Sequence, residues 1–249
     1  MDWVTLKSSD ILRNKKMRLR NKLQDNVRTN EKRIGTVTAS PLGSLIMKNT
    51  KDEYKNKMVR SNYVYMKAWQ RLSFAAEPQG FVSKAMWKGT EREPVIKDFW
   101  SHITGQEIID VEFELHPTIP DFGASPDGII QDNPAVLVEC KHFEGNNMAT
   151  MIEKREIKFE HRVQMIAQIA CFHHRGAREC EYIFANLDDK NGDCITDFDD
   201  LHDHAIQSIR FKPTEEEIQS VLDEVEILVS EISAKFLLLD HRSIPINVH

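Results

Sequence analysis

A carboxylate and a lysine stand two residues apart in an otherwise apolar run. If this run is a β-strand, its two-residue alternation turns Glu139 and Lys141 to one side and Cys140 to the other. Upstream, Asp127 lies in a Pro-Asp-Gly turn sequence that leads into another short strand. We therefore expect Asp127, Glu139 and Lys141 to converge at one edge of a sheet.

Two carboxylates and a lysine suit the hydrolysis of a phosphodiester. The reaction needs an activated water and compensation of charge on the scissile phosphate, which Mg²⁺ held by one or two carboxylates supplies. Asp127 and Glu139 are the expected ligands, with the backbone carbonyl of Cys140 as a further oxygen donor and its thiol inert. Lys141 would orient the water or stabilise the developing charge. Because an Asp followed by Glu-x-Lys is common in a chain that is 29% charged, the motif needs support from elsewhere.

Several helices are expected around these strands. Residues 9–29 lack Pro and Gly and predict a basic helix or arm, whereas residues 36–44 interrupt the helical pattern. An apolar face predicts a helix over about residues 52–76, and another is expected from Gly89 to Ile103 with Pro94 in its first turn. Residues 161–172 predict a helix that packs on the sheet and carries Gln164 and Gln168 on one face.

The remaining pattern completes a mixed α/β arrangement. Short β-type runs occur at about residues 108–115, 128–130, 135–141 and 181–185. Thr214 and Glu217 form a capping-box sequence that opens a terminal helix with a long apolar stripe. We expect a mixed sheet flanked by helices.

Length and composition predict one intracellular, soluble domain. A chain of 249 residues with 41% hydrophobic content can bury one full core. It contains no run of roughly 18 apolar residues that could span a membrane, and its first residues do not form a secretion signal. The four cysteines are spread along the chain, which favours reduced thiols and argues against an iron–sulfur cluster.

The charge is distributed unevenly although the net charge is only −6. The first 33 residues hold ten Lys and Arg against four Asp and Glu, while residues 188–249 hold fifteen acids against five bases. A basic arm can neutralise DNA phosphates, but a solvated helix face explains such a run equally well.

Short motifs in a fixed order resemble those of one nuclease family. They are Arg33-x-Gly35-x-x-Thr38-Ala39-Ser40, Gly89-x-x-x-Glu93, Ser125-Pro126-Asp127-Gly128, Glu139-x-Lys141, Gln168 and Phe184-Ala185-Asn186. In this order they resemble the phage lambda exonuclease, or YqaJ-type viral recombinase, family over about residues 32–186. Each motif is weak by itself, and their shared order is what is specific.

The resemblance implies an α/β fold with a restriction-endonuclease-like PD-(D/E)xK core, in which a mixed central sheet is flanked by helices. It implies a metal-dependent DNA exonuclease that digests double-stranded ends from 5′ to 3′ and leaves 3′ single-stranded overhangs for viral or mobile-element recombination. The implied cofactor is Mg²⁺, bound as a pair of ions for which Mn²⁺ can substitute. The implied partners are double-stranded DNA, further copies of the chain in a ring-shaped homotrimer and a single-strand annealing protein, with no membrane. For a phage-encoded enzyme the expected location is the cytoplasm of the bacterial host.

The resemblance also assigns residues by position. Asp127 and Glu139 match the metal-binding acids and Lys141 the catalytic lysine. Two helical residues complete the implied active site, the acid Glu93 and the glutamine Gln168. Glu91 and Gln164 stay open as alternatives to these two, because each lies on the same predicted helix as the residue that it would replace.

A separate pair is implied to hold the 5′ phosphate of the DNA end. Arg33 and Ser40 match the residues of that pocket, and a guanidinium and a hydroxyl both suit phosphate oxygens.

The whole chain is expected to form a single nuclease domain. It would consist of a basic arm at residues 1–31, a catalytic core at residues 32–187, and an acidic loop with a packing helix at residues 188–249. Two alternatives stay open, an endonuclease on the same fold and a catalytically silent DNA-binding or assembly module.

Overall fold

The computed structural model describes residues 31–46, 53–75 and 84–241 of the chain. Its centre is a five-stranded mixed sheet in the order β2-β5-β6-β7-β8. These strands are β2 (Ile108–Ile109), β5 (Gly128–Ile130), β6 (Asn133–His142), β7 (Glu179–Ala185) and β8 (Ile206–Phe211). β6 runs parallel to β7 and antiparallel to β5, while β8 is antiparallel to β7. The basic arm predicted at residues 9–29 lies outside the described residues.

The central strand β6 is buried on both faces. Val136, Val138 and Cys140 belong to a core that includes apolar side chains of α4 (Lys84–Thr104), while Leu137 belongs to a second core with α6 (Phe159–Phe172). A nearly continuous apolar run is what such a doubly covered strand requires. The alternation of side chains therefore directs Glu139 towards α6 and Cys140 towards α4.

A small second sheet supports α2. It contains β1 (Val37–Thr38), β4 (Phe122–Ala124) and β3 (Glu114–Leu115), with β1 parallel to β4. α2 (Ala39–Ile46) follows β1 directly and packs against α6. The contact depends on Gly43, because a Cβ atom there would come within 2.4 Å of the Glu160 Cα atom.

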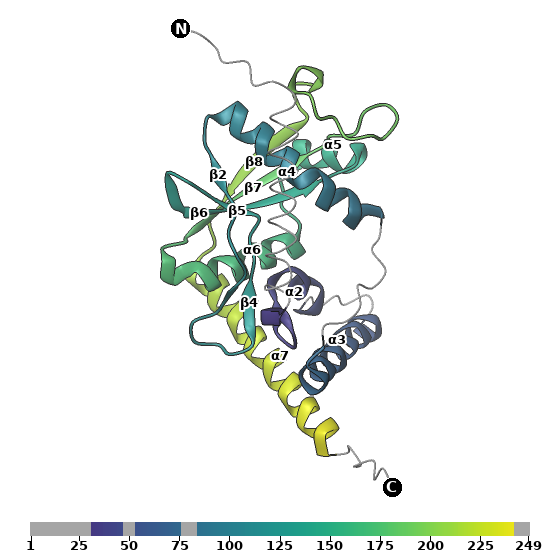
Figure 1. Ribbon diagram of the computed structural model, residues 1–249, viewed down its shortest axis with the longest axis vertical. Coiled ribbons are helices and arrows are strands. Elements are labelled where there is room, and N and C mark those ends of the chain that lie inside the picture. Colours follow the sequence, from purple (N-terminus) through teal and green to yellow (C-terminus); the bar gives the residue numbers. More distant parts are fainter. Residues whose placement is uncertain (1–30, 47–52, 76–83, 242–249) are drawn as a thin grey trace.

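The remaining helices are α3 (Glu53–Ser73), α5 (Gly145–Lys154) and α7 (Glu215–His241). α7 extends from the sheet to the far end of the molecule with α3 alongside it (Figure 1). Its predicted capping box is present, since Thr214 Oγ1 accepts from the Glu217 backbone N at 3.2 Å and Glu217 Oε2 accepts from the Thr214 backbone N at 2.9 Å. Among the described residues, no helix combines the length and apolarity that a membrane span demands.

Three local predictions were wrong. The predicted break over residues 36–44 is limited to residues 36–38, which include β1, because α2 begins at Ala39 and places Pro41 in its first turn, where the missing N–H costs nothing. α4 begins at least as early as Lys84, so Pro94 lies inside it. The run at residues 108–115 is not one strand, because β2 and β3 belong to different sheets.

Candidate active site

The structure brings Asp127, Glu139 and Lys141 together. Asp127 immediately precedes β5 and is held by β6, because its backbone N donates to the Val138 carbonyl at 2.9 Å and its Oδ2 accepts from the Cys140 backbone N at 2.7 Å. Glu139 is fully buried, and the Lys141 ammonium pairs with its Oε1. The two carboxylates and the lysine thus meet where β5 and β6 lie side by side.

Both candidate glutamines of α6 bind Glu139. Gln164 Nε2 donates to Oε1 at 2.7 Å, and Gln168 Nε2 donates to Oε2 at 2.6 Å. Residues four apart lie on one face of a helix, so a single helical face orients both oxygens of the carboxylate. The buried Oε1 atom of Gln168 has no hydrogen-bond partner within the described part of the chain. Gln164 and Gln168 therefore both bind Glu139, and the geometry does not favour one over the other.

α4 contributes Glu93 to the neighbourhood of Asp127, together with a lysine that sequence analysis missed. Glu93 Oε1 pairs with Lys97 Nζ at 2.9 Å, and Lys97 also pairs with Asp110 at 2.8 Å and donates to the backbone carbonyl of Asp127. Glu91 instead pairs with Arg92 at 2.7 Å. Of the two candidate acids, the geometry favours Glu93. The i,i+4 spacing of Glu93 and Lys97 was the available signal for the lysine.

The carboxylates repel one another in this buried setting. Burial raises the pKa of Asp127 well above its usual value, and the nearby charges of Glu139 and Glu93 raise it further. Burial by itself would lower the pKa of Lys141, but the carboxylates of Glu139 and Asp127 outweigh it and raise that pKa. The site therefore concentrates negative charge that a cation would relieve.

These residues suit a hard divalent cation. Across residues 31–46, 53–75 and 84–241, no three His, Cys, Asp or Glu side chains form a ready-made metal site. The donors at hand are oxygens, which Mg²⁺ prefers, and Mg²⁺ commonly uses one or two carboxylates with water completing its shell. The raised pKa of Asp127 and the unpartnered Gln168 Oε1 both fit an additional positive group here. The thiol of Cys140 is no ligand candidate, because burial raises its pKa well above the usual range.

A histidine on the same face of α6 was also missed by sequence analysis. His161 precedes Gln164 by three residues, and its Nδ1 lies 2.6 Å from the Tyr182 hydroxyl. Burial, together with the charges of Lys141 and Lys158, lowers the pKa of His161 to about 3, so its imidazole is neutral near pH 7.

Arg33 and Ser40 have surroundings different from those of the carboxylates. Arg33 stacks over the Phe113 ring at 4.9 Å, and its buried Nε has no hydrogen-bond partner among the described residues. Burial lowers the pKa of Arg33 from its usual value. Ser40 is exposed in the first turn of α2. Neither shares a hydrogen bond or ion pair with Asp127 within the ranges that the structure describes.

A family model described as the YqaJ-like viral recombinase domain matches residues 29–175. The chain belongs to this family. The expected PD-(D/E)xK fold is likewise confirmed by solved structures. An alkaline exonuclease (LHK-Exo) from Laribacter hongkongensis is similar with a TM-score of 0.69 and 27% identity, over 86% of this chain and 96% of that chain. The same values hold for its complex with dAMP.

A more distant structure supports the fold alone. A phage related exonuclease from Haemophilus somnus 129PT has a TM-score of 0.55 and 14% identity, over 84% of this chain and 96% of that chain. No curated protein sequence matches this YqaJ-family chain significantly.

Proposed function

We propose that this YqaJ-family chain is a Mg²⁺-dependent exonuclease that digests double-stranded DNA from 5′ to 3′ and leaves 3′ overhangs for recombination. The observation that carries the proposal is the convergence of Asp127, Glu139 and Lys141 on a chain whose structural relative, at 27% identity, is an alkaline exonuclease. The complex of that relative with dAMP supports a nucleotide as the product.

Each residue at the site has a role that its geometry supports. Asp127, Glu139 and the Cys140 carbonyl would hold Mg²⁺, as a pair of ions or with Mn²⁺ in its place. When bound, the metal supplies charge stabilisation on the phosphate and lowers the pKa of a coordinated water. Lys141 orients that water or the phosphate.

The helices support this arrangement from both sides of the sheet. Gln164 and Gln168 of α6 hold the Glu139 carboxylate in one orientation. Glu93 on α4 completes the acidic set, and Lys97 fixes the main chain at Asp127.

Arg33 and Ser40 are the proposed 5′-phosphate pocket. The buried and unpartnered Nε of Arg33 supports this role, because an unsatisfied guanidinium nitrogen favours an anionic acceptor. The proposed partners follow the family resemblance: a ring-shaped homotrimer, double-stranded DNA and a single-strand annealing protein in the host cytoplasm.

Digestion of linear duplexes labelled at either the 5′ or the 3′ end, with and without Mg²⁺, tests the proposal. We expect early release of the 5′ label only, and only with the metal. Release of the 3′ label first would overturn the polarity, and rapid nicking of covalently closed circles would favour an endonuclease.

The Asp127→Ala variant separates an enzyme from a silent DNA-binding module. It should lose cleavage and keep duplex binding, because the metal ligand is removed while phosphate contacts remain. Metal-dependent cleavage that persists in this variant would reject the proposed site.

A further inference from the structure

The two halves of α4 are anchored in different ways. After Pro94 the helix buries apolar side chains against β6, namely Val95, Ile96, Phe99 and Trp100. Between residues 87 and 93, the buried side chains are those of Lys88 and Arg92. Pro94 also has no N–H to donate to the preceding turn, which weakens the mechanical link between the halves. Charged contacts therefore hold the first half in place.

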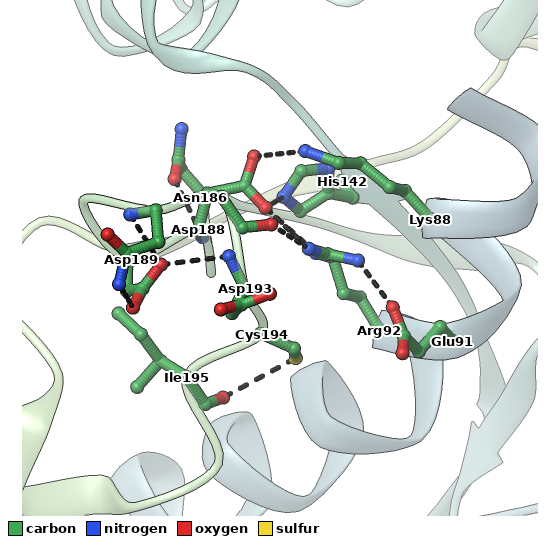
Figure 2. Close-up of polar contacts among 12 residues, drawn as sticks. Lys88, Glu91, Arg92, His142, Asn186, Asp188, Asp189, Asp193, Cys194 and Ile195 are labelled. Carbon is green, nitrogen blue, oxygen red and sulfur yellow. Dashed lines mark hydrogen bonds and ion pairs between the residues drawn. The ribbon is translucent and has the colours of Figure 1, made fainter. Parts of the chain in front are cut away.

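These contacts converge on Asp188, three residues after the end of β7. Arg92 is 1% exposed and donates to Asp188 Oδ1 from Nε at 3.0 Å and from Nη2 at 2.7 Å. Lys88 Nζ binds the other oxygen at 2.7 Å, and His142 Nε2 lies 3.5 Å from Oδ1 without forming a hydrogen bond. We call Lys88, Arg92, His142 and Asp188 the Asp188 clamp (Figure 2).

The loop that carries Asp188 is itself held in shape. Arg92 Nη2 also donates to the Gly192 carbonyl at 3.1 Å, and Asp188 forms a β-bridge with Cys194. Asp189 closes the turn by accepting the backbone N atoms of Asn191 and Asp193, each at 2.8 Å. Figure 2 shows the Arg92 guanidinium reaching from α4 towards Asp188 of this loop. This loop lies beyond residues 29–175, which the family model matches.

The clamp adjoins the candidate active site on two elements. Arg92 directly precedes Glu93 on α4, and His142 directly follows Lys141 on β6. A forked guanidinium bound to a carboxylate fixes direction as well as distance, and a buried Arg needs such a partner to offset its desolvation. Glu93 sits at the junction between the two halves of α4, so the orientation of the first half sets the position of its backbone, while its carboxylate pairs with Lys97 of the second half.

We propose that Asp188 is a positioning residue that acts through Arg92 and Lys88 to hold Glu93 towards the metal-binding carboxylates. The proposal rests on the proposed function. The acidic loop thus serves the active site from outside the family domain. Positions that orient a metal site without touching the metal commonly change metal affinity by about tenfold or more when mutated.

A double-mutant cycle tests this role. The cycle compares the unchanged protein with Asp188→Asn, Glu93→Gln and the double variant. Two quantities are measured for each protein: the rate of DNA cleavage, and the affinity for Mn²⁺ in the absence of DNA. The electron paramagnetic resonance signal of free Mn²⁺ gives the affinity. In the otherwise unchanged enzyme, we expect Asp188→Asn to lower the cleavage rate and the Mn²⁺ affinity by about tenfold each. In the Glu93→Gln background, we expect the same substitution to lower them by less than about twofold. Equal losses in both backgrounds would overturn the proposal, because a purely structural clamp acts independently of Glu93.

The matched control is Asp193→Asn, which removes one negative charge from an exposed side chain of the same loop. It should leave cleavage and Mn²⁺ affinity within about twofold of the unchanged protein. If Asp188→Asn does not fold, Lys88→Met takes its place in the cycle. This substitution removes the ion pair between Lys88 and Asp188 and leaves the pair between Arg92 and Asp188 in place.

The two proposals fail in distinguishable ways. An unchanged protein that binds Mn²⁺ but does not cut DNA contradicts the exonuclease, and the Mn²⁺ cycle then decides the role of Asp188 alone. If the enzyme is active but the losses caused by Asp188→Asn and Glu93→Gln are additive in the double variant, only the positioning role of Asp188 is contradicted.

Discussion

The pKa of Asp127 is raised well above its ordinary value. Burial and two neighbouring carboxylates raise its pKa, so the metal-free site holds a proton on Asp127 at a pH where an exposed Asp would be ionised. In the proposed metal-bound state a cation displaces that proton, so metal binding and proton release would form a single linked equilibrium.

Mg²⁺ should therefore raise the melting temperature more as the pH rises. A raised folded pKa means that stability is present below the unfolded pKa, about 4, and is lost as the pH climbs through the folded value. Mg²⁺ offsets that loss, so its stabilising effect should grow over the same window. Thermal unfolding with and without Mg²⁺, from about pH 5 to pH 9, measures it. In the isosteric control Asp127→Asn, the increase in melting temperature caused by Mg²⁺ should no longer depend on pH. If that increase is the same at every pH in the unchanged protein, the linkage between metal binding and proton release is contradicted.

Arg33→Ala should slow digestion of 5′-phosphorylated ends more than of unphosphorylated ends. A charged hydrogen bond to phosphate contributes about 1.5 to 3 kcal/mol, which corresponds to at least about a tenfold difference in rate. The comparison uses the same duplex with either terminus, so changes in folding cancel. Equal slowing on both substrates would argue against a phosphate pocket at Arg33.

At the scale of elements, one face of α6 and one edge of β6 together make the site. α6 carries His161, Gln164 and Gln168 at spacings of three and four residues, so one helical face meets the Glu139 side of β6. α7 has a different role. It begins with a capping box and then packs along α3 and α6.

Thr214→Ala should lower the free energy of unfolding by about 1 kcal/mol without changing cleavage. The change removes the acceptor of the Glu217 backbone N at the start of α7 and leaves the active site intact. Urea unfolding measures the effect. Ser220→Ala, at an exposed position within the same helix, is the control and should be neutral or slightly stabilising, since Ala favours a helix interior. A loss as large in the control would mean that the cap contributes nothing.

At the scale of the whole molecule, two apolar cores lie on opposite faces of the sheet. The smaller core joins α4 to β6, and the larger one joins α6, α2, α3 and α7. Glu139 faces α6, so its removal from water depends on the packing of α6 against the sheet. Two amide donors from α6 and the Lys141 ammonium stabilise its buried carboxylate.

Leu228→Ala should cost about 2 to 5 kcal/mol of stability, because Leu228 is fully buried on α7 within the larger core. The neighbouring Ile227 is 50% exposed, so Ile227→Ala should cost much less. Chemical denaturation of both variants compares them on one helix. Similar losses would show that α7 does not pack as the structure has it.

Much of the fold could be predicted from the sequence because its signals are local. Two-residue alternation in β6, the turn before β5 and the capping box of α7 each depend on neighbours within a few residues. The ordered motifs predicted the family, which the family model confirms. The same patterns named Asp127, Glu139, Lys141 and Gln168, which the structure places together.

The errors arose where packing outweighs local preference. Pro94 would end an isolated helix, but α4 continues through it because the residues that follow bury four large apolar side chains against β6. β2 and β3 are too short to be distinguished from one longer strand without knowledge of which sheet each joins.

Sequence alone determined which residue types could bind a cation and in which order they occur along the chain. Tertiary structure alone decided that Gln164 and Gln168 bind Glu139 together, that Glu93 rather than Glu91 faces Asp127, and that Lys97 joins them. The physical reason is that these contacts cross from helices to strands distant in the sequence. Charge pairing over a few ångströms depends on distances that only the packed cores establish.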